Sequence, residues 1–115
     1  MIVKKSDRNI KKLESCHEGK GSVTAEEVLI HTEKTGLRFF HKTHVPPGSS
    51  VGEHVHESGC HELFLVCEGQ LSFLFNGVAH DLSEGDMCIV REGDDHAIEN
   101  KTQSPAAFYV VGVNT

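Results

Sequence analysis

Two stretches of this chain decide its fold and its chemistry: GSSVGEHVHESGCHELFLVCEG at residues 48–69 and GDMCIVREGDDHAIEN at residues 85–100. The first holds His54 and His56 and then Glu62, and the second holds His96. Side chains two residues apart in an extended strand point to the same face, so His54 and His56 can offer two imidazoles to one ion. The remaining donors must come from elsewhere, and a folded barrel could supply Glu62 and His96.

Short apolar runs separated by turn signals surround these stretches. We expect strands at residues 23–31, 37–45, 62–67, 70–75, 78–82, 87–90, 96–100 and 106–113, and a short one at 2–4. Asn76-Gly77 between two of these runs predicts a type I′ hairpin, whose two central residues need positive φ. Strands that recur every 8 to 12 residues or so are typical of a sandwich or a closed barrel.

The spacing within the two stretches resembles the two sequence motifs of the cupin family. The first motif is Gly, five residues, His-x-His, three or four residues, Glu, six residues and Gly; it is filled, with five residues before the Glu, by Gly48, His54, His56, Glu62 and Gly69. The second is Gly, five residues, Pro-x-Gly, two residues, His, three residues and Asn; it is filled, with Arg91 at the Pro position, by Gly85, Gly93, His96 and Asn100. The motifs and the segment between them cover a little under half of the chain.

This resemblance implies an all-β fold, a double-stranded β-helix or jelly-roll barrel, in a single domain. The N-terminal arm would span about residues 1–22 and the barrel about residues 23–115. One divalent metal ion would lie between the motifs, held by His54, His56, Glu62 and His96. Small members of the family commonly pair through sheet edges, which implies a homodimer that uses the first strands. The family's reactions are too varied for the resemblance to fix one.

The fourth metal donor has a competitor in the sequence. One extra residue before Glu62 puts His61 at the usual offset from His56. Adjacent strand residues point to opposite faces, so only one of the two can face the ion. Counting back from Gly69 gives Glu62, and we therefore place the insertion in the loop 57–60. Cys60 ends this loop. Its thiol either coordinates the metal ion or becomes oxidised, or it is simply a reduced thiol.

Composition bounds the class of protein. A chain of 115 residues suits one domain, and a formal net charge of -6 opposes nucleic-acid binding, which needs a positive face. The basic cluster at residues 4–12 is interrupted by acidic side chains, and we expect a solvated terminal strand there. No apolar run reaches the roughly 18 to 20 residues that span a bilayer, and no secretory h-region follows Lys4 and Lys5. Four cysteines without a CxxC pair indicate reduced thiols, so we expect a cytoplasmic protein. From the net charge and the short apolar runs, we expect it to bind neither nucleic acid nor membrane.

The ligand set points to metal chemistry on a small molecule. Three imidazoles and one carboxylate suit Fe, Mn, Ni, Co, Cu or Zn as divalent ions. Four protein donors leave two positions open on an ion that prefers six, whereas a tetrahedral zinc would be closed. We expect a metal-dependent enzyme of the dioxygenase or isomerase type, acting on a small organic acid, a carbonyl compound or a sugar. The alternative is a non-catalytic metal or small-ligand binding module with a structural zinc.

Several residues near the motifs invite further roles. His41 and His44 lie on opposite faces of their strand, so one of them could point into the barrel and donate to substrate. Asn100 favours a structural hydrogen bond, and Asp94 and Asp95 favour turn formation over general-base catalysis. Candidates for an apolar pocket wall are Phe39, Phe64, Phe73, Phe75, Met87, Phe108 and Tyr109.

Overall fold

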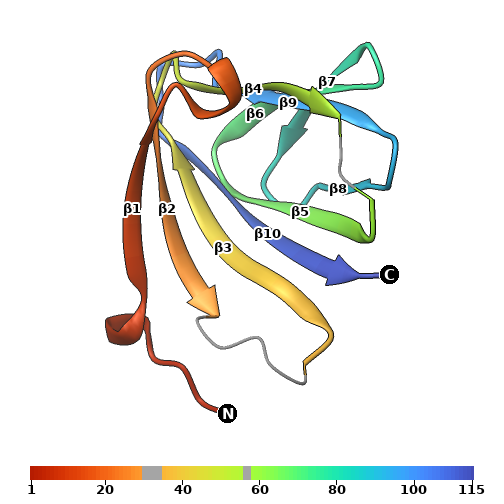
Figure 1. Ribbon diagram of the computed structural model, residues 1–115. Helices are drawn as coiled ribbons and strands as arrows, with labels where there is room; N and C mark the ends of the chain where they lie inside the picture. The colour runs from red at the N-terminus through yellow and green to blue at the C-terminus, as the bar shows by residue number, and fades with distance from the viewer. Residues whose placement is uncertain (30–34, 56–57) are drawn as a thin grey trace.

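The computed structural model describes residues 1–29, 35–55 and 58–115. Two antiparallel sheets face each other, one of six strands in the order β1-β2-β3-β10-β5-β8 and one of four in the order β4-β9-β6-β7 (Figure 1). The strands are β1 (Asn9–Glu14), β2 (Ser22–Leu29), β3 (Leu37–Val45), β4 (Ser50–Val55), β5 (Cys60–Glu68), β6 (Gln70–Phe75), β7 (Val78–Ser83), β8 (Met87–Val90), β9 (Asp95–Glu99) and β10 (Ala106–Asn114). Two short 3-10 turns, η1 (Lys5–Asp7) and η2 (Cys16–Glu18), are also present. Within the described ranges, no helix has the length and apolarity to cross a membrane.

The chain passes repeatedly from one sheet to the other between β3 and β10. Strands β3, β5, β8 and β10 belong to the six-stranded sheet, and β4, β6, β7 and β9 belong to the four-stranded sheet. This alternation rolls the chain into a jelly-roll barrel, so the expected fold class is confirmed. It also brings β4, β5 and β9, which carry the two motifs, around one interior.

The hairpin expected at Asn76-Gly77 is confirmed. Asn76 has φ +48° and Gly77 has φ +82°, as a type I′ turn requires. The turn sets the register of β6 on β7, in which Phe75 pairs with Val78. Side-chain alternation along β6 therefore follows from this turn.

The N-terminal strand differs from the expectation. Residues 2–4 form no strand, and the first strand is instead β1, whose six residues are all exposed. Main-chain pairing of β1 with β2, from Asn9 opposite Glu27 to Glu14 opposite Ser22, forms this strand without burying its side chains. The expectation of a solvated terminal strand for the basic cluster is confirmed for Lys11 and Lys12, which lie in β1.

Strand β5 begins two residues earlier than the expected range of 62–67. It starts at Cys60 because β10 continues past its expected end and pairs Asn114 with Cys60. His61 and Glu62 are therefore strand residues, and the alternation of β5 decides which way each one points. The end of the strand expected at 23–31 lies partly outside the described residues.

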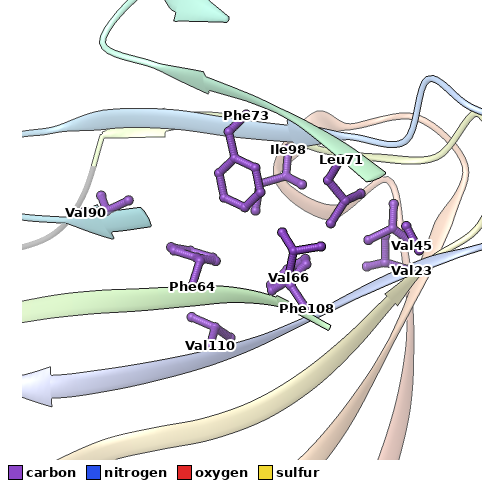
Figure 2. Close-up of a cluster of buried hydrophobic side chains, with 11 residues drawn as sticks. Val23, Val45, Phe64, Val66, Leu71, Phe73, Val90, Ile98, Phe108 and Val110 are labelled. Carbon is purple, nitrogen blue, oxygen red and sulfur yellow. The ribbon is translucent and has the colours of Figure 1, made fainter. Parts of the chain in front are cut away.

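The core lies between the two sheets (Figure 2). Its centre is an aromatic group in which Phe64 contacts Phe73 edge-on, with 5.6 Å between ring centroids, and Phe108 at 5.4 Å. Such pairs contribute about 0.5–1.5 kcal/mol beyond the area that they bury. Around them pack Val23, Val45, Val66, Leu71, Val90, Ile98, Ala106 and Val110. This packing fixes the distance between the motif-bearing strands of the two sheets.

Turn η2 packs directly on strand β4. A Cβ atom at Gly52 would lie 1.9 Å from the His17 carbonyl oxygen, and one at Gly19 would lie 2.2 Å from the Ser50 carbonyl oxygen. Only glycine allows the two backbones to approach so closely. The contact lies next to the register shift between Val51 and His54, so η2 supports the part of β4 that leads into the first motif's histidines.

Candidate metal centre

His96 lies in β9 and faces the interior between the sheets. It is 2% exposed, and its ring lies 5.5 Å from that of Phe64, which comes from β5 in the facing sheet. Ile98, two residues on, is buried in the same way, whereas Asp95, Ala97 and Glu99 are partly exposed. A polar ring at this depth is costly unless it is hydrogen-bonded or binds a ligand, which fits a metal donor.

Glu62 lies on the interior face of β5. The ladder between β5 and β10 runs without a shift from Cys60 to Val66, so alternation holds over this stretch. Cys60, Phe64 and Val66 are buried, and Glu62 shares their face. Glu62 and Phe64 are about 7 Å apart along the strand, which brings Glu62 near the end of the barrel where Phe64 contacts His96.

His61 lies on the other face of β5. It shares that face with Leu63 and Leu65, which line an apolar groove on the outer side of the six-stranded sheet. Leu65 is 44% exposed. Of the two competitors for the fourth position, the strand therefore turns Glu62 toward the interior and His61 away from it.

The histidines of the first motif are described only in part. The backbone of His54 pairs with that of His96 across the β4–β9 ladder. His56 lies outside the described residues.

Part of the barrel interior is hollow. A cavity of about 160 Å³ lies between the sheets, and it exceeds the roughly 30 Å³ that one water occupies in the liquid. Its polar lining includes His96 from β9 and His41 and Thr43 from β3. Its apolar wall includes Val23, Ala25, Val51, Phe64, Ile98, Phe108 and Val110. Of the expected wall residues, Phe64 and Phe108 therefore reach the cavity, whereas Met87 and Tyr109 line the outer groove.

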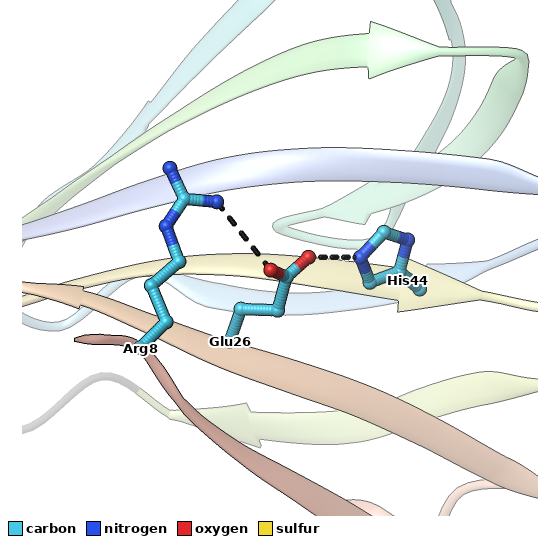
Figure 3. Close-up of polar contacts among 3 residues, drawn as sticks. All are labelled: Arg8, Glu26 and His44. Carbon is cyan, nitrogen blue, oxygen red and sulfur yellow. Dashed lines mark hydrogen bonds and ion pairs between the residues drawn. The ribbon is translucent and has the colours of Figure 1, made fainter. Parts of the chain in front are cut away.

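His41 and His44 take the opposite faces expected of them. His44 points outward, where its Nε2 donates to Oε2 of Glu26 at 2.5 Å, and Arg8 Nη1 lies 3.4 Å from the other oxygen of Glu26 (Figure 3). The hydrogen bond from His44 is the main cause that lowers the pKa of Glu26. His41 points inward, and burial lowers its pKa, with the nearby Glu27 carboxylate acting in the opposite direction.

Sequence reasoning gave no role to Cys16 and His17, which also line the cavity. They belong to η2, where Ser15, His17 and Glu18 all have positive φ. No residue spacing marks this turn, since it reaches the cavity only through its packing on Gly52. Partial burial raises the pKa of the Cys16 thiol, which keeps it protonated at neutral pH.

The turn before His96 is held by side chains rather than by a proline. Asp94 Oδ2 accepts a hydrogen bond from the Arg91 backbone N–H at 2.8 Å, and Asp94 Oδ1 accepts one from Asn76 Nδ2 at 2.9 Å. The Asp95 backbone N–H donates to Asn76 Oδ1 at 2.9 Å. The expectation that Asp94 serves turn formation is confirmed, and Arg91 is exposed where the motif has proline.

The donors described so far fit a divalent ion in kind. A buried imidazole and an inward carboxylate come from facing sheets, and the backbone of a second histidine pairs with the first. Among the side chains that are described, no group of three or more His, Cys, Asp or Glu residues is arranged to hold a metal ion. The side chains of His54 and His56 lie outside that set.

Comparison with known proteins gives one consistent family. The family profile described as a cupin domain matches residues 41–112. The oxalate-binding protein of Thermotoga maritima is 32% identical, over 96% of this chain and 92% of that protein. A crystal structure of a Thermotoga maritima protein, described as a predicted oxalate decarboxylase, superposes with a TM-score of 0.91 at 32% identity over the whole of both chains. A sugar phosphate isomerase of the cupin superfamily from Silicibacter pomeroyi has a TM-score of 0.81 at 18% identity, over 100% of this chain and 76% of that one, which shows the fold alone.

Proposed function

The chain belongs to the cupin family, and we propose that it binds one divalent metal ion inside the barrel and, on that ion, a small dicarboxylic acid of the oxalate class. The observation that carries the proposal is the buried ring of His96, which lines a small, mostly apolar cavity between the sheets, together with the place of Glu62 on the interior face of β5 in the facing sheet. The proposed metal donors are His54, His56, Glu62 and His96.

The donor set supports a borderline divalent ion. Imidazole nitrogens and a carboxylate oxygen suit Mn, Fe, Co, Ni, Cu and Zn, and an ion that prefers six ligands would keep open positions for a carboxylate of the acid. When bound, such an ion supplies Lewis acidity that polarises a carboxylate or carbonyl oxygen. The protein's own contribution is to hold the donors on rigid strands, with His96 fixed against Phe64.

The cavity supports a small ligand. Pockets for drug-sized ligands enclose about 300–1,000 Å³, whereas this one encloses about 160 Å³. The relative named for oxalate binding aligns over nearly the whole chain, so a ligand of two to four carbon atoms or so is the chemistry that we propose.

Metal analysis and calorimetry on the same preparation test the proposal. We expect about one ion per chain after loading with Mn(II), and saturable oxalate binding that disappears when the metal is removed with a chelator. Glu62→Gln should lower metal occupancy, while His61→Gln, its matched neighbour on the outer face, should leave it unchanged. Equal loss of metal in both variants would contradict the assignment of Glu62.

The same preparation separates a catalyst from a structural zinc site. Turnover of the dioxygenase or isomerase type needs open positions on the ion, and it is measured as oxygen uptake or as product formation from organic acids, carbonyl compounds and sugars. A zinc ion that survives exhaustive chelation, together with no binding of oxalate, would favour the non-catalytic structural site instead.

We also propose that the protein forms a homodimer through β1. This strand is an edge of the six-stranded sheet, and Ile10 and Leu13 are 67% and 38% exposed on it. An uncovered edge presents backbone donors and acceptors that invite pairing with a second copy. Light scattering should give twice the chain mass of 12.6 kDa, and Lys12→Pro, which removes one backbone donor, should shift the mass toward one chain. A single-chain mass for the unmodified protein would contradict this proposal.

The proposed location is the cytoplasm, in agreement with the cysteines. All four cysteines are free of disulfides, and Cys60 is buried. Thiol titration of protein that is purified without reductant and then unfolded should give four thiols per chain. A lower count from fresh material would argue for an oxidising compartment.

A further inference from the structure

We propose that His41 binds the ligand's second carboxylate across the cavity from the metal, and so selects dicarboxylates over monocarboxylates. This inference rests on the proposed function and names the residue that completes the acid-binding site. His41 is a ligand-binding residue on β3 and is separate from the proposed metal donors.

The position of His41 places its ring on the cavity. Along β3, Phe39, His41, Thr43 and Val45 share the interior face, and His41 pairs with Val110, which also lines the cavity. His41 belongs to the six-stranded sheet, whereas His96 belongs to the four-stranded sheet, so the two rings line the cavity from facing sheets. A ligand held on the His96 side therefore has His41 as a wall on the other side.

The hydrogen-bonding capacity of His41 is available for a ligand. Its contacts with described residues are a tilted ring contact with Phe39, at 5.1 Å between centroids, and longer-range charge interactions with Glu27 and Lys11. In contrast, His44 on the same strand uses its Nε2 on Glu26. An imidazole that faces a cavity without a protein partner among the described residues can offer an N–H to a bound group.

The surroundings of His41 make it neutral rather than cationic at neutral pH. Burial lowers its pKa, and Glu27, its partner across the β2–β3 ladder, is already engaged by other groups. Lys11 Nζ lies 2.6 Å from one oxygen of Glu27, and Asn9 Nδ2 donates to the other at 3.2 Å. Lys11 and Asn9 thus hold the Glu27 carboxylate, and burial outweighs its opposing effect on the pKa of His41, which remains a neutral donor at the cavity wall.

The rest of the cavity explains why a dicarboxylate needs this residue. Most of the wall is aliphatic or aromatic, and a carboxylate oxygen that faces such a wall without a donor is strongly disfavoured. One carboxylate of the ligand can be satisfied by the metal ion. Polar side chains on the β3 side of the cavity are His41 and Thr43, and of the two His41 is the less buried and extends further from the strand.

A purely structural role is the competing explanation. The contact with Phe39 could mean that His41 only fills space at the edge of the core. His41→Phe keeps a ring at this position and removes both nitrogens, so it separates ring packing from hydrogen bonding. His41→Gln restores an N–H donor without the ring.

The test compares oxalate with formate on Mn(II)-loaded protein by calorimetry, with metal content measured for each variant. His41→Phe should bind oxalate roughly tenfold to a hundredfold more weakly than the unmodified protein, because it loses a hydrogen bond to a charged group. Its formate affinity and metal content should be nearly unchanged. His41→Gln should recover part of the oxalate affinity, and the exposed His80→Gln should match the unmodified protein.

Three results would overturn the inference, and they are distinguishable. Oxalate affinity within about twofold of the unmodified protein in both His41 variants would remove His41 from the site and leave the proposed function standing. Parallel losses for oxalate and formate in His41→Phe would show a structural effect instead. If the unmodified, metal-loaded protein binds no oxalate, the proposed function fails and this inference fails with it.

Discussion

Replacing Asn100 should strongly lower the unfolding free energy of the protein, because hydrogen bonds from this side chain hold the end of the strand that carries His96. Asn100 is fully buried. Its Nδ2 donates to the carbonyls of Val45 at 2.9 Å and Ser104 at 2.8 Å. Its Oδ1 accepts from the backbone N–H and the hydroxyl of Thr102, at 2.9 and 2.8 Å. The expected structural role of this motif residue is confirmed.

The cost of Asn100→Ala follows from these four contacts. Each hydrogen bond contributes about 0.5–1.5 kcal/mol net, and a buried group left unsatisfied costs about 1–3 kcal/mol. Ser104 is exposed and its carbonyl can turn to water, whereas Val45 is fully buried and its carbonyl cannot. We therefore expect a loss of roughly 2–4 kcal/mol, out of the 5–15 kcal/mol or so that is typical of a domain.

Urea unfolding followed by far-ultraviolet circular dichroism measures this loss, since the chain has no Trp for fluorescence. Asn9→Ala is the control, because Asn9 is exposed and makes a single side-chain hydrogen bond to Glu27, so it should cost under about 0.5 kcal/mol. Asn100→Asp keeps the acceptor oxygens but loses both donated bonds and buries a charge, and it should destabilise at least as much as alanine. A loss below about 1 kcal/mol for Asn100→Ala, with an unchanged urea dependence, would refute the reasoning.

Two further predictions concern the outer ion network and the support of β4. Glu26→Gln should lower the unfolding free energy by about 1 kcal/mol at pH 7, since His44 and Arg8 are partly solvated. The folded-state pKa of Glu26 lies below its ordinary 4.5, so that stabilisation is complete above pH 4.5 and is lost as the pH falls through the folded pKa. A difference in unfolding free energy between Glu26→Gln and the unmodified protein that stays constant down to pH 3 or so would contradict this. Gly52→Ala should cost roughly 1–3 kcal/mol and weaken metal binding, because its Cβ would collide with the His17 carbonyl and displace β4 ahead of His54. Unchanged stability and metal affinity in this variant would show that η2 does not support β4.

Sequence pattern predicted the parts of this fold that depend on local rules. The Asn76-Gly77 hairpin follows from backbone sterics alone, and the two motifs carry the jelly-roll assignment. The inward turn of Glu62 needed one further fact, the place where β5 begins, since strand alternation then fixes its face. Pairing with β10 supplies that fact, and it is not encoded near residue 60.

Other features depend on contacts between distant segments, and the sequence carries no local sign of them. Strand β1 forms by pairing with β2, although none of its side chains is buried. Cys16 and His17 reach the cavity only because two glycines let η2 lie against β4. The alternation of β3 separates the faces of His41 and His44, but only the register of the sheet shows which of the two faces inward.

The most direct test of the account is a crystal structure of the metal-loaded protein with anomalous diffraction recorded at the absorption edge of the bound ion. We predict a single anomalous peak inside the barrel, coordinated by His54, His56 and His96 and by an oxygen of Glu62, with His61 pointing away from it. A peak outside the barrel, or one coordinated by His61 in place of Glu62, would contradict the proposed centre.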